Sequence, residues 1–396
     1  MLKEKYVTLG KKPSAIRTLF EYGKVRKAEI GEDKVFDFSI GNPNAPAPEC
    51  VKNSLIDLLN NDSSFHLHGY TSSVGDLKVR QAIASFLNEK YHANTDEKLI
   101  YVSSGAAPSL AIIFNCVVNK GDEVITFAPH WPDYRVLIEQ VEGVIIEVKP
   151  EHTHFYPDFD DLLNKISDKT KAVVINSPNN PTGTVYDEAV IKRLSEILSN
   201  KQKEYGHPIY LVSDEPYREL LYKDEEYPFI TNYYDNSIVC YSFSKSLSLP
   251  GERIGYILVN PKCESVNDVF AVICGSASML GYICAPALFQ HMVPYVLGHT
   301  SNLEEYKKNK ETLVTALKEI GFEIVNPTGA FYLFMKALEP DAEKFSEVAK
   351  QFELLLVPSD PFDYKGYVRI AYCVSYKQIV NSITAFKKLY NYYKNR

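Results

Sequence analysis

The sequence lacks the features that mark several common classes of protein. Its seven cysteines are scattered, odd in number and without a CxxC pair, which excludes a disulfide framework and indicates reduced thiols in a cytoplasmic protein. The net charge of −7 lacks the basic footprint of a nucleic-acid-binding protein. The segment from Val269 to Leu303 has no charged residue, but glycines and prolines interrupt it. We therefore expect buried or interface helices there and no membrane span.

Several sequence motifs are also missing. Residues 1–6 have no apolar core of a secretory signal, and they carry an early acidic residue, so we expect neither a signal nor a transit peptide. No Walker loop, GxGxxG or GxSxG motif occurs, so kinase, dinucleotide-binding and serine-hydrolase functions have no starting point. The histidine pairs at 66 and 68 and at 152 and 154 have no further ligand at a diagnostic spacing, so we predict no metal site.

What the chain does have is a long alternation of β-branched runs with helical patterns. Its 396 residues, 45% hydrophobic and 23% charged, are enough for one large globular domain with a smaller one attached. Strand and helix in alternation predict an α/β fold with a mainly parallel sheet covered by helices on both faces. The predicted strands lie in the runs 99–102, 123–127, 144–148, 172–175, 209–212, 238–241 and 253–258.

The pattern changes after Leu303. A long charged helix is followed by two short strands, at 322–325 and 330–334, and by a closing amphipathic helix from Tyr376 to Tyr393. This order is typical of an α+β module. We expect a large domain at 46–290, and a smaller domain formed by 291–396 together with an N-terminal arm at 1–45.

The segment Ser242-Phe-Ser-Lys245 carries the most chemical information. It lies between a β-branched run and Gly251-Glu-Arg253-Ile-Gly255, so a lysine, two hydroxyls and an arginine reach one small region. This composition is expected of a Schiff-base lysine beside a phosphate site. A single lysine after a serine would otherwise be a solvated surface charge.

Loops at the carboxyl ends of the predicted strands supply further candidates, since ligands bind there in open α/β sheets. The turn at Gly105 opens an apolar helix and is either a tight packing turn or an anion site built from free amides. Asp214 is either a helix N-cap or a carboxylate paired to a pyridinium nitrogen. Asn180 suits turn chemistry alone, and Trp131 suits either the core or stacking on a cofactor face.

Taken together, these segments resemble the pyridoxal-phosphate-dependent aminotransferases of fold type I, class I/II, the group that includes the aspartate aminotransferases. The resemblance implies a three-layer α/β/α large domain on a mainly parallel seven-stranded sheet, with a smaller α+β domain. The matching segments are Pro13-Ser-Ala15, Gly41-Asn-Pro43, Gly69-Tyr70, Gly105, Trp131, Asn180-Pro-Thr-Gly183, Asp214-Glu-Pro-Tyr217, Ser242-Phe-Ser-Lys245 and Val368-Arg369-Ile370.

The resemblance also implies a role for each matching residue. Lys245 is similar to the lysine that binds the cofactor and moves the substrate α-proton, and Asp214 to the partner of the pyridine nitrogen. Arg369 is similar to the arginine that grips the substrate α-carboxylate. The remaining implied roles are the ring oxygen (Tyr217, Asn180), the ring face (Trp131), the phosphate (Gly105, Ala106, Ala107, Ser242, Arg253, and Tyr70 from the second subunit of a homodimer) and the carboxylate (Gly41, Asn180).

The implied activity is transfer of an amino group from an L-amino acid to a 2-oxo acid, with 2-oxoglutarate expected, through pyridoxamine phosphate in a ping-pong cycle. A cysteine-conjugate β-lyase is the alternative, because it uses the same residues. A non-catalytic sensor domain of a transcription regulator is disfavoured by the acidic charge.

Three departures from the family pattern bear on substrate choice. Ala106, Ala107 and Pro108 offer no side-chain charge where dicarboxylate-handling relatives often have one, so the sequence does not predict a preference for aspartate. The apolar Ile16 and Phe20 on the N-terminal arm suit an uncharged substrate side chain. The segment 357–361 has no glycine after its proline, so the loop leading to Arg369 is expected to differ in shape.

Overall fold

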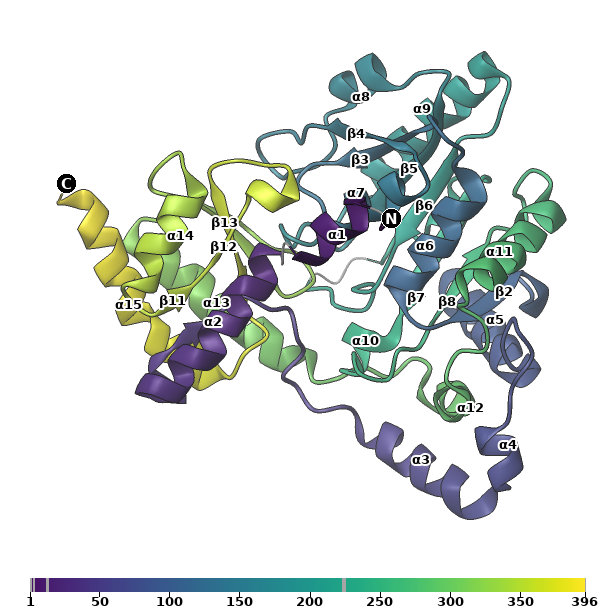
Figure 1. The fold of residues 1–396 in the computed structure, drawn as a ribbon, viewed down its shortest axis with the longest axis horizontal. Helices are drawn as coiled ribbons and strands as arrows, with labels where there is room; N and C mark the ends of the chain where they lie inside the picture. The colour runs from purple at the N-terminus through teal and green to yellow at the C-terminus, as the bar shows by residue number, and fades with distance from the viewer. Residues whose placement is uncertain (1, 3, 12–13, 223–225, 396) are drawn as a thin grey trace.

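The computed structural model describes residues 2, 4–11, 14–222 and 226–395, so Pro13 of the resemblance lies outside the described residues. A seven-stranded sheet in the order β2-β8-β7-β6-β5-β3-β4 forms the larger part of the molecule (Figure 1). Strand β8 runs antiparallel to both neighbours, and the other pairs are parallel. The strands are β2 (Ile100–Ser103), β3 (Glu123–Phe127), β4 (Val144–Val148), β5 (Thr170–Asn176), β6 (Tyr210–Asp214), β7 (Ser237–Ser242) and β8 (Gly255–Val259).

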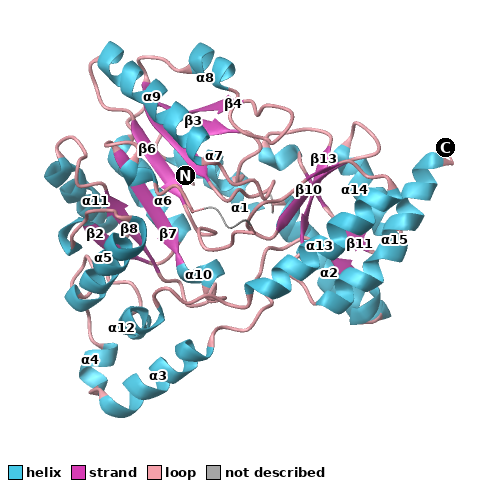
Figure 2. Ribbon diagram, turned by 180° about the vertical axis from the view of Figure 1, so that it is seen from behind, coloured by secondary structure: helices cyan, strands magenta, loops and turns pink. Residues whose placement is uncertain are grey.

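Helices cover both faces of this sheet, as the alternation along each strand requires. On β5, Val173 packs into the core on one face and Val174 into the core on the other, because successive side chains of a strand point to opposite sides. One face is covered by α6 (Ala106–Val117), α7 (Asp133–Gln140) and α11 (Val266–Leu280). The other is covered by α5 (Leu77–Tyr91), α8 (Phe159–Lys165), α9 (Glu188–Tyr205) and α12 (Ala287–Val296) (Figure 2).

Local sequence signals set the ends of these helices. The Asp187 side chain accepts a hydrogen bond from the amide of Val190 and caps α9, and Gly206 ends that helix in the left-handed conformation. Beyond the sheet, α3 (Glu49–Asn61) and α4 (Ser64–His68) pack on α12. The charge-free segment forms α11 and α12 with a break between them, and no described helix is long and apolar enough to cross a membrane.

The C-terminal part is a smaller α+β unit. An antiparallel sheet in the order β12-β13-β10-β9 and a parallel pair of β1 with β11 share one core with the flanking helices. The arm helix α2 (Ala15–Ile30) packs on this unit, whereas α1 (Glu4–Lys11) reaches α7, where Lys5 Nζ donates to the carbonyl oxygen of Glu139 (Figure 1). The other elements are β1 (Phe36–Asp37), β9 (Ile324–Val325), β10 (Tyr332–Lys336), β11 (Leu354–Leu355), β12 (Val357–Pro358), β13 (Tyr367–Ala371), α13 (Leu303–Ile320), α14 (Ala342–Lys350) and α15 (Tyr376–Lys394).

The predicted α/β class and the seven strand runs are confirmed, with shifts of one to two residues at most strand ends. The strand expected at 322–325 covers only Ile324–Val325. The reason is local: the amides of Gly321 and Phe322 both donate to the carbonyl of Leu317, so these residues close helix α13 and are not free to pair in a strand. The division into domains at 46–290 stays a prediction.

Candidate active site

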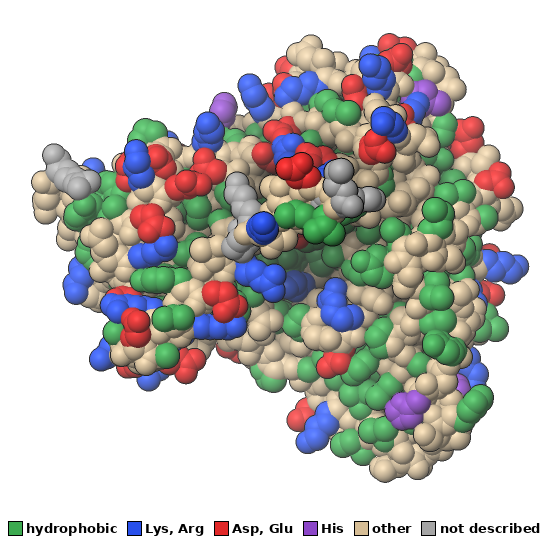
Figure 3. All heavy atoms as spheres, in the orientation of Figure 1, with side chains coloured by type: hydrophobic (Ala, Val, Ile, Leu, Met, Phe, Trp, Pro, Cys, Tyr) green, Lys and Arg blue, Asp and Glu red, His purple; other side chains and the backbone are tan. Residues whose placement is uncertain are grey.

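Loops that leave the seven-stranded sheet surround a cavity of about 280 Å³. The hollow between the sheet and the C-terminal part is visible in Figure 3, with Lys and Arg side chains gathered in it. The cavity is lined by Ile16, Gly41, Ala106, Ala107, Trp131, Asn176, Asn180, Asp214, Pro216, Tyr217, Ser242, Ser244, Lys245, Pro250, Arg253, Tyr332 and Arg369. Segments more than 350 residues apart in the sequence therefore meet at one site.

Lys245 lies in the short helix α10 (Phe243–Ser246), directly after β7. Its Nζ donates a hydrogen bond to the carbonyl oxygen of Gly41 at 2.7 Å. The pKa of Lys245 is lowered to about 8, mainly by burial; Cys373 acts to raise it, and the nearby Arg369 and Arg253 guanidinium groups help to lower it. A depressed pKa increases the fraction of neutral amine, which is the form that acts as a nucleophile or accepts a proton.

Asp214 ends β6 and presents one unsatisfied oxygen. Its Oδ2 accepts a hydrogen bond from the Tyr134 hydroxyl at 2.7 Å. Its Oδ1 is buried and has no hydrogen-bond partner in the described part of the chain. Burial raises the pKa of Asp214 to about 7, with a smaller contribution from the charge of Glu215. A buried carboxylate oxygen requires a donor, and a protonated pyridine nitrogen is one that fits.

Arg369, on β13, is a buried cation with no acidic partner among the described residues. Only 2% of its surface is exposed, and its Nε has no hydrogen-bond partner there. Its Nη1 donates to Asn180 Oδ1 at 3.1 Å, and its Nη2 donates to the carbonyl oxygen of Ser39. Burial lowers the pKa of Arg369. Because a buried charge is costly unless it is paired, this guanidinium favours an anionic ligand such as a carboxylate.

A hydrogen-bond chain joins Asp214 to Arg369 through two asparagines. Asn176 donates its side-chain amide to the Asp214 carbonyl at 2.9 Å and accepts from the Asn180 amide at 2.8 Å. Asn180 then accepts from Arg369. The position of the carboxylate-binding candidate is thus fixed relative to the buried acid.

Tyr217 and Tyr332 form a second link across the cavity. Their hydroxyl oxygens lie 3.0 Å apart, and the Arg369 guanidinium carbon lies 4.8 Å from the Tyr332 ring centroid. A Cβ at Gly41 would stand 1.9 Å from the Tyr332 hydroxyl, so only glycine allows this approach. Burial raises the pKa of both tyrosines, to about 12 for Tyr332.

The opposite end of the cavity is suited to a phosphate. Gly105, with φ of +95°, precedes α6, whose first residues Ala106 and Ala107 line the cavity. The amides of a helix N-terminus point outward and attract anions. A Cβ at Gly105 would lie 2.7 Å from Nη2 of Arg253, so this glycine admits the guanidinium.

Two hydroxyls complete the phosphate end. The Ser242 and Ser244 oxygens lie 2.8 Å apart, and Arg253 Nη1 approaches Ser244 Oγ at 3.4 Å. The cradle of amides, hydroxyls and a guanidinium has the donor set that a phosphate monoester requires, so the residues present fit pyridoxal phosphate.

Most predicted site residues thus meet at one cavity, but three are absent from its described lining. Gly105 directly precedes the lining residues Ala106 and Ala107. The Tyr70 side chain is 98% exposed and is absent from the described lining. Phe20 is also absent from that lining, although Ile16 of the same helix is present. Trp131 lines the cavity, with its ring edge-on to Tyr134 at 5.5 Å between centroids.

Sequence reasoning missed Tyr134, Asn176 and Tyr332, whereas Ser244 was one of the two hydroxyls expected beside Lys245. Tyr134 could have been found from its place three residues after Trp131. Asn176 directly follows a predicted strand, so it carried a positional signal. Tyr332 carried none, since it begins β10 and its pairing partner there, Ala371, is distant in sequence.

A larger cavity of about 890 Å³ lies elsewhere. Its wall includes Arg218, which is buried, pairs with Glu215 at 2.6 Å and lies over the Tyr241 ring. None of the predicted site residues lines it. Size alone therefore does not identify the site, and the convergence of Lys245, Asp214 and Arg369 carries more weight.

Comparisons with known proteins agree with this geometry. The family model "Aminotransferase class I and II" matches residues 33–386. Aspartate aminotransferase of Thermotoga maritima is 28% identical, with 91% of this chain and 92% of the relative covered. The probable aspartate/prephenate aminotransferase of Aquifex aeolicus is 30% identical, with 95% and 96% covered.

Solved structures give the same answer. An amino transferase from Eubacterium rectale has a TM-score of 0.97 at 47% identity, with 99% of each chain covered. The Thermotoga maritima aspartate aminotransferase structure has a TM-score of 0.85 at 28% identity, with 96% of this chain and 98% of that one covered. The chain therefore belongs to the class I and II aminotransferases and has their type I fold.

Proposed function

We propose that this aminotransferase uses pyridoxal phosphate to move the amino group of an L-amino acid to 2-oxoglutarate in a ping-pong cycle. The observation that carries the proposal is the unpartnered buried oxygen of Asp214, which lines the same cavity as the Lys245 amine. An acid and a lysine in this relation are needed by a cofactor with a basic ring nitrogen and an aldehyde. When bound, pyridoxal phosphate supplies an electron sink for the substrate α-carbon.

The residues of the cavity divide the work of holding the cofactor. Asp214 would hold the ring nitrogen, and Tyr217 and Asn180 would hold the ring hydroxyl oxygen. Trp131 would stack on the ring. The phosphate would be held by Gly105, the amides of Ala106 and Ala107, Ser242 and Arg253, together with the Ser244 hydroxyl that Arg253 contacts.

Lys245 attaches the cofactor and then moves a proton to and from the substrate α-carbon. Its lowered pKa of about 8 supplies the neutral amine that both tasks need. The Gly41 carbonyl, which accepts from Nζ, orients the amine toward the cavity. Arg369 binds the substrate α-carboxylate, with Asn180 and Gly41 beside it. The hydrogen-bond chain through Asn176 holds Arg369 in a fixed position relative to Asp214.

Two observations point to different amino donors. Several relatives are named aspartate aminotransferases, which favours aspartate. Ile16 and Ala107 in the cavity wall are apolar, which favours an uncharged side chain. The three cations that line the cavity, Lys245, Arg253 and Arg369, already have roles toward the lysine linkage, the phosphate and the α-carboxylate.

The functional unit that we propose is a homodimer in the cytoplasm. A 98% exposed tyrosine is unusual for a single chain, and Tyr70 reaching the phosphate of the neighbouring subunit accounts for it. All seven cysteines are free thiols, as expected in a reducing compartment. We further propose that residues 46–290 hold the cofactor and that 1–45 with 291–396 close over the substrate.

The half-reaction tests this function. The purified protein is loaded with pyridoxal phosphate, and aspartate, alanine, tyrosine and leucine are added singly without any oxo acid. Conversion of the visible cofactor band to that of its amine form, with stoichiometric oxo acid, supports transamination and ranks the donors. Release of pyruvate and ammonia from a cysteine conjugate, with no conversion by any amino acid, would instead establish the β-lyase.

A further inference from the structure

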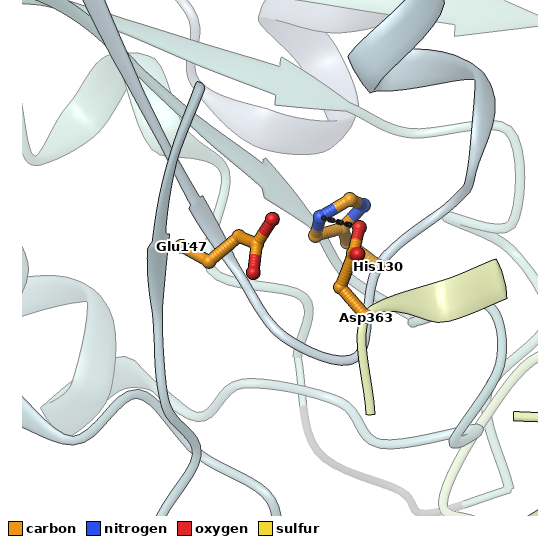
Figure 4. Close-up of side chains that lie close together, drawn as sticks. All are labelled: His130, Glu147 and Asp363. Atoms are coloured by element: carbon orange, nitrogen blue, oxygen red, sulfur yellow. Dashed lines mark ion pairs between the residues drawn. The ribbon is translucent and has the colours of Figure 1, made fainter. Parts of the chain in front are cut away.

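A histidine and two carboxylates meet outside the described lining of the cavity (Figure 4), and the histidine directly precedes Trp131 in the sequence. His130 lies in the loop between β3 and α7, Glu147 lies on β4, and Asp363 lies just before β13. Their nearest ligand atoms lie within 4.8 Å of one another. Figure 4 shows Asp363 reaching from the C-terminal part of the chain toward His130 in the loop after β3.

An arginine already occupies the centre of this cluster. Arg135, on the first turn of α7, pairs through Nη2 with Glu147 and, at 3.2 Å, with Asp363. A guanidinium between two carboxylates leaves no reason to place a cation there. The group is therefore a network of ion pairs that joins the sheet to the C-terminal part.

His130 is the buried member of the network, with 2% of its surface exposed. Its Nδ1 lies 3.0 Å from the Trp131 carbonyl oxygen, and because a carbonyl only accepts, this nitrogen donates. Its Nε2 lies 3.2 Å from Asp363 Oδ2, without the alignment of a hydrogen bond. Burial acts to raise the pKa of Asp363, but the neighbouring His130 and Arg135 lower it overall, so Asp363 stays a carboxylate.

The segment that contains Asp363 also contacts His130 through the backbone. The amide of His130 donates to the carbonyl oxygen of Phe362 at 3.1 Å. The Phe362 ring centroid lies 5.3 Å from the guanidinium carbon of Arg369. Contacts therefore run without a break from Trp131, through His130 and Phe362, to Arg369.

We infer that His130, held by Asp363, is a positioning residue that fixes the Trp131 loop to the segment before Arg369, so that the cofactor face and the carboxylate grip keep one relative position. Neither side chain lines the cavity, so neither contacts the reacting atoms. The effect on the substrate rests on the proposed function. The tie, by which we mean the link between the Trp131 loop and the segment before Arg369, does not.

The chain offers a direct reporter of this tie, since Trp131 is its only tryptophan. In the pyridoxal-phosphate holoenzyme, His130→Gln and Asp363→Asn should each make Trp131 fluorescence at least about twofold easier to quench with acrylamide. The donor KM should rise about tenfold, with kcat and cofactor affinity changed less than about twofold. Both substitutions remove the same contact, between His130 and Asp363. The quenching and KM of the double variant should therefore match those of the more affected single variant.

Glu139→Gln is the matched control, because Glu139 pairs with Nη1 of Arg135 at 3.8 Å, whereas Glu147 and Asp363 pair with Nη2. It should leave quenching and KM unchanged. Wild-type quenching in both site variants, or KM effects that multiply in the double variant, would overturn the inference. If His130→Gln does not fold, Asp363→Asn alone decides. Absence of transamination in the wild-type protein would refute the proposed function, and the quenching comparison would still decide the tie.

Discussion

The two ends of the cavity each present an arginine, and the two arginines are held differently. Arg253 is exposed, has φ of +52° and shares its end with two hydroxyls and a helix N-terminus. Arg369 is 2% exposed, lies between the rings of Tyr332 and Phe362, and has no acidic partner among the described residues. One end thus spreads the binding of an anion over many donors, and the other concentrates it on a single buried cation.

The difference bears on what each end can tolerate. Hydrogen bonds from several exposed donors each contribute modestly, because water competes for every one of them. A buried guanidinium whose desolvation cost has already been met contributes more to binding, and its loss leaves the ligand carboxylate unpaired. The following changes should therefore have unequal effects, in descending order.

Lys245→Ala removes the group between the two ends and should have the largest effect. Transamination should fall by at least about 10⁴-fold, since both the attachment and the proton transfer are lost. The cofactor should still bind without covalent attachment, because neither end of the cavity changes. Steady-state rates and equilibrium dialysis of the cofactor measure the two effects separately.

Lys318→Ala, on the exposed face of α13, is the control and should behave as wild type. Retention of even a few per cent of transamination by Lys245→Ala would show that another residue performs the proton transfer.

Arg369→Ala tests the concentrated end. The KM for the amino donor should rise roughly 10²–10³-fold, because truncating one partner of a buried charge pair costs several kcal/mol. Cofactor affinity should change little. Arg369→Lys keeps the charge but loses the two parallel donors of the guanidinium, so its donor KM should lie between those of the wild type and Arg369→Ala. An equal loss of donor and cofactor binding would mean that Arg369 is a structural residue and not the carboxylate grip.

Lys245 and Asp214 could be proposed as site residues from the sequence because of their position, whereas Arg369 could not. Lys245 and Asp214 follow strands whose periodicity is plain, so the carboxyl edge of the sheet locates them. Arg369 was located by resemblance alone, since an arginine inside a strand is otherwise an ordinary ion-pair partner.

The supporting contacts could not be predicted in the same way. The Tyr217–Tyr332 hydroxyl pair joins residues 115 apart, and the Arg369–Asn180 hydrogen bond joins residues 189 apart. Such contacts depend on how the C-terminal part packs on the sheet, which no local pattern encodes. Tyr70 shows a related limit: it is 98% exposed, and the role that we propose for it in a neighbouring subunit depends on contacts outside its own chain.

Asp214→Asn tests the buried acid between the two ends through pH. Folding raises the pKa of Asp214 from 3.8 to about 7, so the folded carboxyl holds a proton that the unfolded chain has released. The free energy of unfolding of the cofactor-free protein should therefore fall by about 3 kcal/mol as pH rises between these values. Asp214→Asn should remove that fall, and Glu319→Gln should not. Urea unfolding across this pH range measures the free energy of unfolding. The same pH dependence of that free energy in Asp214→Asn and in wild type would contradict the raised pKa of Asp214.

Arg253→Ala should have the smallest effect, and its size decides whether the comparison between the two ends holds. Ser242, Ser244 and the amides at the start of α6 remain in place, so cofactor affinity should drop only about tenfold while the donor KM stays close to wild type. Ser244→Ala should lower affinity by less, and the two substitutions together should show coupling, because Arg253 contacts the Ser244 hydroxyl. If Arg253→Ala weakened cofactor binding by as much as Arg369→Ala weakens donor binding, the phosphate end would also depend on one cation. The two ends would then differ only in how exposed their arginines are.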